Sequence, residues 1–168
     1  MTGLEPARQV ILEIGCVITD SQLKIIAESD SLVIHHSEEV LARMDPWCIE
    51  QHGKSGLSDR VRKSLLTTAQ AEQMILDFIK PHVEPQSSPL CGNSIGQDRR
   101  FLVKYMPTLN NFFHYRNIDV STVKELVKRW YADSLQPPEK KKNHQVMDDI
   151  KESIEELHFY RTKIFRPS

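Results

Sequence analysis

The chain has 168 residues, of which 22 are Lys or Arg and 23 are Asp or Glu, so its net charge is −1. With 39% hydrophobic residues it can bury the core of one globular domain, which we expect to span residues 1–168. The balanced charge excludes the broad basic surface that binds long nucleic acids, and no apolar stretch reaches the roughly 18 residues of a membrane span.

The first part of the chain is expected to begin with strands. Residues 10–18 are rich in β-branched side chains and predict a buried strand, and residues 23–34 supply one or two more. Ser37 is placed to cap a short helix that reaches Met44. A second helix is expected to begin at Pro46, because proline is tolerated at the first helical position.

Strands and helices are expected to alternate further along the chain. Thr67 or Thr68 begins a helix with an apolar face of helical period, and Pro81 ends it. Residues 90–93 predict a strand, and residues 97–105 predict the helix that follows it. The order of elements therefore favours an α/β or α+β domain.

The last third is expected to hold one more strand and two helices. Residues 115–120 predict the strand, and Thr122 with Glu125 matches a capping box at the start of a helix. Residues 132–142 contain two prolines and predict a mobile linker inside the domain. The final amphipathic helix is expected over residues 145–164.

Two acids and a histidine indicate phosphodiester chemistry. Asp98 follows an apolar strand and two glycines, and His144 stands five residues before Asp149. Residues five apart on one helix point about 140° apart, so the two can share a site only if His144 precedes the helix that carries Asp149. A histidine in a loop suits a general base, and a carboxylate on a helix suits a metal ligand. Asp148 would then face solvent.

The same residues also have interpretations that involve no catalytic role. His144 could be a residue at a helix N-terminus that bonds to backbone, and an acid such as Asp98 in the first turn of a helix is ordinary dipole chemistry. An HD-type metal phosphohydrolase is disfavoured, because the sequence lacks a His-Asp dipeptide.

Several separate segments resemble oligoribonucleases, which are DEDDh-type 3′-to-5′ exonucleases of the DnaQ-like group. The likeness runs in order along the chain, through residues 1–4, 91–101, 115–116, 119–122 and 144–150. It implies an RNase H-like α/β domain, a mixed sheet flanked by helices. It also implies hydrolysis of short RNA, chiefly dinucleotides, to mononucleotides with two Mg²⁺ or Mn²⁺ ions.

The resemblance also assigns roles to individual residues. Asp98 and Asp149 correspond to two of four metal-binding carboxylates, and His144 corresponds to the general base. The residues that would contact substrate are the base-contacting Leu4 and Trp47, and the terminal-phosphate cap of Ser94, Arg116, Ser121 and Thr122. Tyr115 would reach into the site of a partner subunit, which implies a homodimer.

Other interpretations of these residues are a core position for Trp47 and a polar strand edge for residues 114–116. In the family an Asp-x-Glu pair directly precedes the segment that resembles residues 1–4, so the first strand is expected to be missing here. Glu13 lies within a strand and is not expected to replace that pair. The alternative function is therefore a catalytically incomplete form that dimerises or binds short RNA.

The expected compartment is intracellular, either cytoplasmic or mitochondrial. The three cysteines are far apart, match no metal-binding spacing and are expected to be reduced core thiols. No signal or transit peptide is visible. Lys140–Lys142 is more typical of a solvated loop than of a localisation signal.

Overall fold

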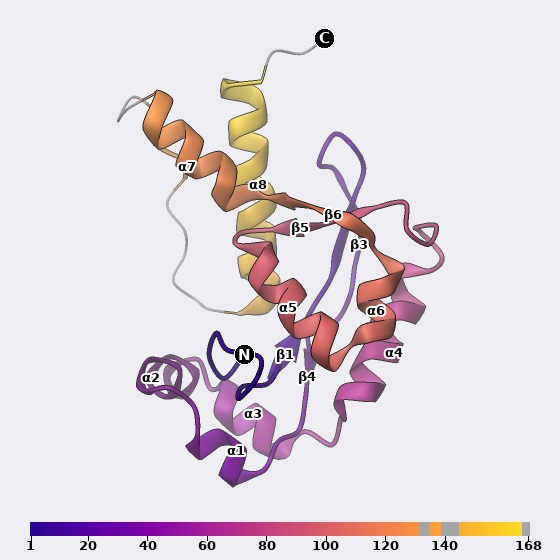
Figure 1. Cartoon of the computed structure of the whole chain (residues 1–168), viewed down its shortest axis with the longest axis vertical. Coiled ribbons are helices and arrows are strands. Elements are labelled where there is room, and N and C mark those ends of the chain that lie inside the picture. The colour runs from indigo at the N-terminus through magenta and orange to yellow at the C-terminus, as the bar shows by residue number, and fades with distance from the viewer. Residues whose placement is uncertain (132–134, 139–144, 166–168) are drawn as a thin grey trace.

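The structure, a computed structural model, describes residues 1–131, 135–138 and 145–165. The first part of the fold contains short strands and then helices (Figure 1). The bounds of these elements are β1 Glu13–Ile14, β2 Val17–Thr19, β3 Ile25–Glu28, β4 Leu32–Val33, α1 Glu38–Ala42, α2 Pro46–Lys54, α3 Leu57–Lys63 and α4 Thr68–Ile79.

The second part alternates between strands and helices. Its elements are β5 Pro89–Gly92, α5 Ile95–Tyr105, α6 Pro107–Phe112, β6 His114–Asp119, α7 Val120–Trp130 and α8 Val146–Lys163. The final helix agrees with the prediction for residues 145–164. None of the helices in the described part of the chain is long and apolar enough to cross a membrane.

The predicted α/β class is confirmed. The strands form three separate two-stranded pairs rather than one continuous mixed sheet. Strands β1 and β4 are antiparallel, β2 and β3 are antiparallel, and β5 and β6 are parallel. The strand predicted over residues 10–18 is interrupted between Ile14 and Val17. A Cβ atom at Gly15 would lie only 2.6 Å from the sulfur of Met147, so α8 packs tightly against the backbone at this interruption.

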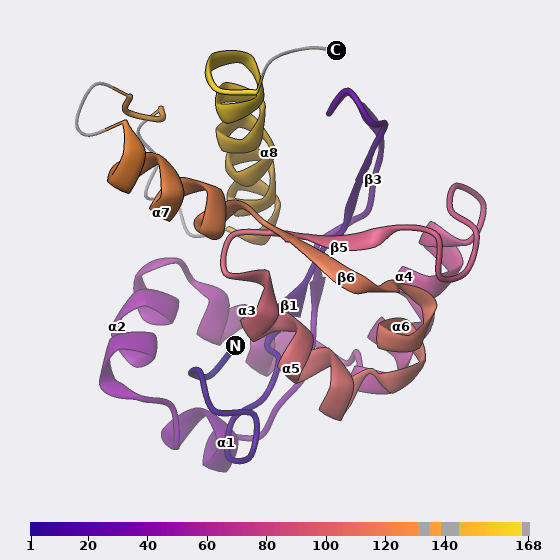
Figure 2. The ribbon, with the colours of Figure 1, turned by 45° about the horizontal axis from the view of Figure 1, so that its top comes forward.

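The parallel pair lies between two helical layers. Figures 1 and 2 show α8 on one side of β5 and β6, and α5 with α6 on the other. The same views place the N-terminus between α2 and α5. This arrangement matters because it brings the first residues of the chain close to the helix that follows β5.

Three apolar clusters hold these layers together. One joins the early strands to α4, α5 and α6 through residues such as Ile34, Ile75 and Phe101. A second packs α1, α2 and α3 around Leu12, and a third packs α7 against α8 around Tyr160. Each cluster removes apolar surface from water, which is the main favourable contribution to folding.

Helix starts follow local hydrogen-bonding chemistry, with one correction. The cap at Thr67 is confirmed, because its hydroxyl accepts from the Gln70 amide while the Gln70 side chain accepts from Thr67 N. The capping box predicted at Thr122 and Glu125 is wrong. Helix α7 begins three residues earlier, because the Asp119 carboxylate accepts from Ser121 N and caps the helix there.

Two helices were not predicted at all. They are α3 and α6, with seven and six residues. Helices this short repeat their apolar pattern less than twice, so packing rather than periodicity decides whether they form.

Candidate functional site

The carboxyl ends of the two parallel strands form one edge of the molecule. Gly92, the last residue of β5, pairs with Asp119, the last residue of β6. In parallel sheets such ends and the loops after them are the usual place for ligands. The loop after β5 carries Ser94, and the first turn after β6 carries Ser121.

Hydrogen bonds lock these two hydroxyls together. The amide of Ser94 donates to Asp119 Oδ1 at 2.9 Å and to Ser121 Oγ at 3.0 Å, and the two serine hydroxyl oxygens are 3.2 Å apart. Ser94 has a φ of 51°, in the left-handed region that residues other than glycine rarely adopt. The Asp119 carboxylate therefore holds both serines in a fixed position.

The buried carboxylate of Glu156 supports the serine cluster through Asn93. Asn93 donates through Nδ2 to Glu156 Oε2 at 3.2 Å and to Ser121 Oγ at 3.4 Å. Glu156 is only 3% exposed, and it also accepts from the Tyr160 hydroxyl and forms an ion pair with Lys124. Burial, together with the bond to Glu156, raises the pKa of Tyr160. These contacts offset the cost of burying the charge.

Asp119, Asn93 and Glu156 were given no role by the sequence argument. Asp119 had a usable signal, since an aspartate before an amphipathic segment is a typical helix cap. Asn93 and Glu156 had none, because the partners that make them informative lie 63 positions apart in the chain.

A groove of about 300 Å³ adjoins the serine cluster. Its lining includes two residues of the predicted phosphate cap, and in full it consists of Asp119, Ser121, Thr122, Glu125, Leu126 and Arg129. The lining provides two hydroxyl groups, from Ser121 and Thr122. Its guanidinium, that of Arg129, is paired with Glu125 at 2.6 Å.

The other two predicted contacts on β6 lie at its amino end. Tyr115 is 74% exposed and Arg116 is exposed beside it, with the guanidinium carbon 5.4 Å from the centre of the tyrosine ring. At about 3.3 Å per residue, Arg116 lies roughly 10 Å from Asp119 along the strand. The structure therefore brings Ser94 and Ser121 into contact beside the groove that Thr122 lines, and it does not bring Arg116 into that cluster.

The loop that carries Leu4 is attached to α5. Gln97 donates to the Leu4 carbonyl, while Lys104 Nζ and the Tyr105 hydroxyl donate to the Pro6 carbonyl at 2.6 and 3.0 Å. The Leu4 side chain itself is 69% exposed. An apolar side chain held this way is available for contact with a ligand.

Trp47 lies in the first turn of α2 and is 62% exposed, so the core interpretation of this residue is wrong. Helix α2 reaches the same N-terminal loop, because the His52 ring donates through Nε2 to the Met1 carbonyl at 2.9 Å. The N-terminal loop thus connects the helix of Trp47 with the helix of Asp98.

Asp98 is a half-buried acid in the first turn of α5. Burial raises the pKa of Asp98, and the nearby Met1 amine acts in the opposite direction. Burial likewise lowers the pKa of the Met1 amine. A carboxylate that has lost water in this way is stabilised by a nearby cation.

Asp149 is exposed, whereas its neighbour Asp148 is half-buried, so the prediction that Asp148 faces solvent is wrong. Asp149 and Glu156 are seven residues apart, or about two helical turns, and so share one face of α8. Glu156 bonds to Asn93 on that face, and Asp149 lies about 10 Å from Glu156 along the helix axis.

Within the described ranges 1–131, 135–138 and 145–165, no three acidic, histidine or cysteine side chains gather to hold a metal ion. Glu13 is 6% exposed and engaged elsewhere, since it forms an ion pair with Arg60 at 2.7 Å and accepts from the Ser31 hydroxyl at 2.6 Å. His144, like most of the predicted linker, lies outside the described residues.

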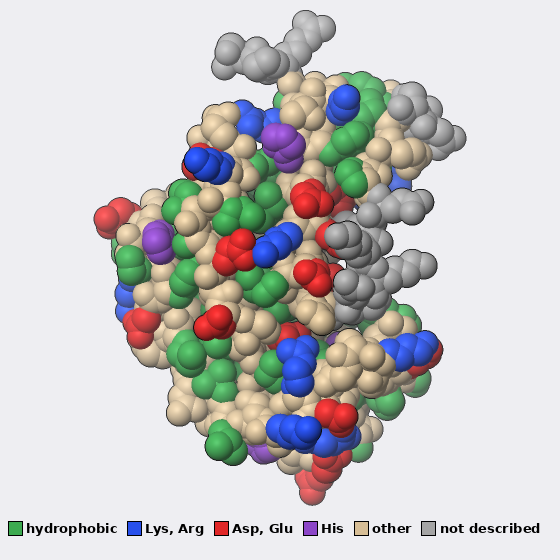
Figure 3. Space-filling view, turned by 180° about the vertical axis from the view of Figure 1, so that it is seen from behind, with side chains coloured by type: hydrophobic (Ala, Val, Ile, Leu, Met, Phe, Trp, Pro, Cys, Tyr) green, Lys and Arg blue, Asp and Glu red, His purple; other side chains and the backbone are tan. Residues whose placement is uncertain are grey.

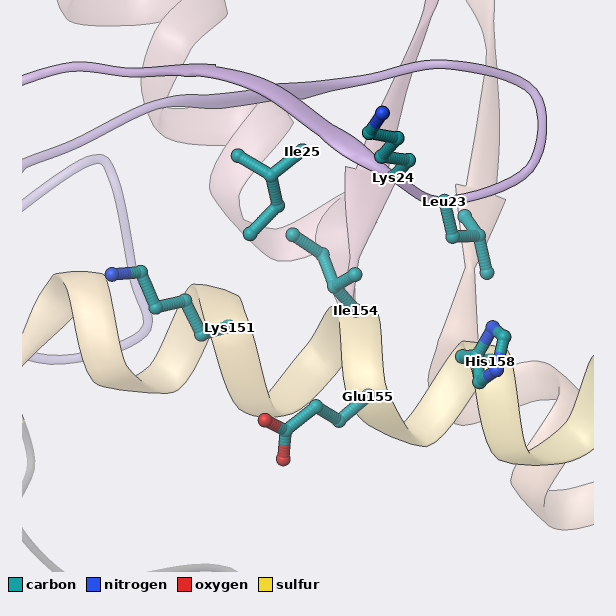
Figure 4. A pocket seen from close by; sticks show the side chains of 7 residues that line it. All are labelled: Leu23, Lys24, Ile25, Lys151, Ile154, Glu155 and His158. Atoms are coloured by element: carbon teal, nitrogen blue, oxygen red, sulfur yellow. The ribbon is translucent and has the colours of Figure 1, made fainter.

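A second groove lies away from this edge, between the β2–β3 hairpin and α8 (Figure 4). Leu23, Ile25 and Ile154 contribute its apolar lining, and it contains none of the predicted site residues. The rear face of the molecule mixes acidic, basic and apolar side chains without a large field of one charge (Figure 3). All three cysteines are free thiols, although Cys91 is exposed rather than in the core.

Comparison with known proteins gives a consistent result. A family model described as an exonuclease, of the RNase T group, matches residues 1–157. The oligoribonuclease of Marinobacter nauticus is 55% identical over 166 residues, covering 99% of this chain and 92% of the relative. The oligoribonucleases of Pseudoalteromonas atlantica and Aeromonas hydrophila are 55% and 53% identical, covering 98% and 99% of this chain and 91% and 92% of those relatives.

Proposed function

This chain belongs to the exonuclease family, among the oligoribonucleases, and from that premise we propose that it is a 3′-to-5′ exoribonuclease of short RNA. Its substrates would be oligoribonucleotides, chiefly dinucleotides, and its products mononucleotides. The observation that carries the proposal is the cluster of Ser94, Asp119 and Ser121 at the paired ends of β5 and β6. A fixed set of hydroxyl groups at this position suits one terminal phosphate.

The terminal phosphate is the feature that would select short substrates. Ser94, Ser121 and Thr122 would each supply a hydroxyl donor, and Arg116 would supply two parallel donors from its guanidinium. A chain that continued past this phosphate would lose those contacts. This cap therefore favours an RNA that ends after a few nucleotides.

The bases would be held by two exposed apolar side chains. Trp47 offers a flat ring on which a base can stack, and Leu4 offers an aliphatic edge beside α5. Stacking is tolerant of sequence because every base has a π-face. Such an enzyme would degrade fragments of many sequences.

Exonucleases of this family use divalent metal ions, and we propose Mg²⁺ or Mn²⁺ here, held in part by Asp98 and Asp149. Carboxylate oxygens are the donor type that these ions prefer. When bound, the metal would promote attack by water and stabilise the leaving oxygen. His144 would accept the proton of the attacking water as the general base.

The proposed assembly is a homodimer. β6 is paired on one side only, with β5, among the described residues, and Tyr115 is exposed on it. An exposed aromatic on a strand edge is a common anchor of subunit interfaces. Tyr115 would extend from one subunit into the partner's site.

The cytoplasm is the proposed compartment. The relatives named above come from bacteria, which have no mitochondria, so a mitochondrial location gains no support from them.

A second candidate is a protein that binds short RNA or dimerises without cleaving it. It is favoured by one observation, the absence of three clustered metal ligands among the described residues. Hydrolysis separates the two candidates. Dinucleotide binding without cleavage, in Mg²⁺ or Mn²⁺, would support the second.

Two variants test the first candidate. We expect Arg116→Ala to weaken dinucleotide binding by roughly 10- to 100-fold and binding of a seven-nucleotide RNA far less, since one charge-assisted bond is worth about 1.5–3 kcal/mol. We expect His144→Ala to lower the hydrolysis rate by about 10²–10⁴-fold. Arg62→Ala is the matched control, because Arg62 is exposed and pairs with Glu38 on α1 and Asp59 on α3.

Equal losses for the two RNA lengths would contradict the role of Arg116. Normal hydrolysis by His144→Ala would contradict the role of His144. Titration calorimetry and chromatography of the products provide the two measurements.

A further inference from the structure

Strand β6 contains a two-residue bulge at its amino end. Pro89 of β5 pairs with His114, but the next residue of β5, Leu90, pairs with Asn117. One step along β5 therefore corresponds to three steps along β6, which leaves Tyr115 and Arg116 without partners in the ladder. Bulges are rare in parallel pairs, and they often redirect side chains next to functional sites.

The bulge changes where the side chains point. In a regular strand, neighbouring residues project to opposite faces. Here the Arg116 guanidinium carbon lies 5.4 Å from the centre of the Tyr115 ring, and the His114 ring centre is 4.4 Å away on the same tyrosine. The bulge thus gathers three successive side chains into one stack.

The carbonyl groups freed by the bulge bond to one side chain, that of Arg99. Its guanidinium donates through Nη2 to the His114 carbonyl at 2.8 Å, and through Nη1 to the Tyr115 and Arg116 carbonyls at 3.1 and 3.2 Å. The same Nη1 donates to Asn117 Oδ1 at 2.7 Å. Arg99 therefore spans the bulge from its first residue to its last.

Arg99 is itself fixed in place. It lies on α5, next to Asp98, and its Nε donates to Asn110 Oδ1 at 3.2 Å. The freed amide of Arg116 is satisfied separately, because it donates to His114 Nδ1 at 3.1 Å. Only a planar group with five donors can serve this many acceptors at once, so lysine is not an equivalent replacement.

We propose that Arg99 is a positioning residue that fixes the β6 bulge and so presents Tyr115 and Arg116 to the terminal phosphate and the partner subunit. The part that concerns substrate rests on the proposed exoribonuclease function. The part that concerns the backbone does not, since it depends only on the contacts described above. Arg99 touches no substrate in this scheme and acts through Arg116 and Tyr115.

The test compares Arg99→Lys with its neighbour Arg100→Lys. Arg100 is exposed on the same helix, and its guanidinium bonds to Gln97 and Glu5 rather than to β6, so it is a matched control. For Arg99→Lys we expect the KM for a dinucleotide to rise about 10- to 100-fold with little change in kcat, as a small misplacement of a binding group produces. The KM for a seven-nucleotide RNA should stay within about threefold.

Hydrogen exchange measures the backbone directly and independently of RNA. In Arg99→Lys the amides of residues 114–117 should exchange faster, while those of α4 and α8 stay as in the parent chain. Asn117→Ala, which removes one acceptor and keeps the guanidinium, should shift both readouts in the same direction by less. This variant also serves if Arg99→Lys folds poorly in thermal melting.

The outcomes separate the two proposals. Unchanged exchange over residues 114–117 in both variants would overturn the positioning role, whatever the RNA results are. Faster exchange with equal KM changes for the two RNA lengths would show that Arg99 has only a structural role. That result would also overturn the proposal that Arg99 positions Arg116 for the terminal phosphate. A parent chain that neither binds nor cleaves dinucleotides would overturn the proposed function, while the exchange result would still decide whether Arg99 fixes the bulge.

Discussion

The two ends of the fold use different means of holding their residues in place. Around Leu12, helices α1 to α3 pack through fully buried apolar side chains such as Val61. At the carboxyl ends of β5 and β6, the fixed residues Asn93, Ser94 and Ser121 are polar and at most partly buried. They are held because they donate hydrogen bonds to the carboxylates of Asp119 and Glu156.

This difference indicates which region mainly determines stability and which mainly determines function. Apolar packing is tolerant in direction but contributes much free energy per residue. Hydrogen bonds contribute less but fix direction. We therefore expect changes in the Leu12 cluster to alter the free energy of unfolding, and changes at the strand ends to alter the binding of RNA.

The largest expected effect is on stability. Leu12→Ala should lower the free energy of unfolding by about 2–5 kcal/mol, since it leaves a cavity in a fully buried cluster. The relative affinity for two- and seven-nucleotide RNA should not change in the folded fraction. Chemical denaturation and binding assays measure the two quantities.

Leu65→Ala is the control for this variant, because Leu65 is almost fully exposed and its loss should have little effect. A Leu12→Ala protein that is as stable as its parent would contradict the conclusion that the Leu12 cluster determines the stability of the fold.

A smaller stability effect, joined to a binding effect, is expected at Asp119. Asp119→Ala should lower the free energy of unfolding by about 0.5–2 kcal/mol, the usual cost of losing a helix cap. Dinucleotide affinity should fall as well, because Ser94 and Ser121 would lose their shared acceptor.

Asp20→Ala provides a close control for Asp119→Ala. Asp20 also accepts two backbone amides, from Gln22 and Lys24, but it lies in the loop between β2 and β3, away from the serine cluster. The Asp20→Ala variant should have a lower free energy of unfolding and unchanged RNA binding. Equal binding losses in both variants would count against the cluster as a binding site.

The smallest expected effect is a gain in stability at Asp98. Burial raises the pKa of Asp98 above its value in the unfolded chain, so the ionised form is disfavoured by folding. Asp98→Asn should therefore raise the melting temperature slightly at neutral pH without metal. The gain should shrink as the pH falls through the raised folded pKa, and it should vanish well below the unfolded pKa of about 3.9, where both states are protonated.

Melting curves at several pH values, with and without Mg²⁺, measure this effect. The same variant should lose hydrolytic activity. A fall in melting temperature at neutral pH would mean that the Met1 amine outweighs the cost of burying Asp98.

Much of the local structure could be predicted from local signals. Proline at position 46, the capping pair Thr67 and Gln70 and the period of α8 each depend on neighbours within a few residues, and each appears as expected. The α7 cap was misplaced for an instructive reason. Thr122 and Glu125 satisfy the local pattern, but the helix is capped by Asp119, which accepts from Ser121 N. Asp119 also accepts from Ser94 N, 25 positions away, a contact that the local pattern does not contain.

The sequence by itself determined the family, the positions of most helices and the residue types of the site, because motifs and periodicity are written in nearby residues. Tertiary structure alone decided that Trp47 is exposed, that Asp149 is more exposed than Asp148, and that Arg99 spans the bulge in β6. These outcomes depend on which segments meet in space. Packing and long-range hydrogen bonds determine which segments come into contact, and these contacts cannot be inferred from a pattern of neighbouring residues.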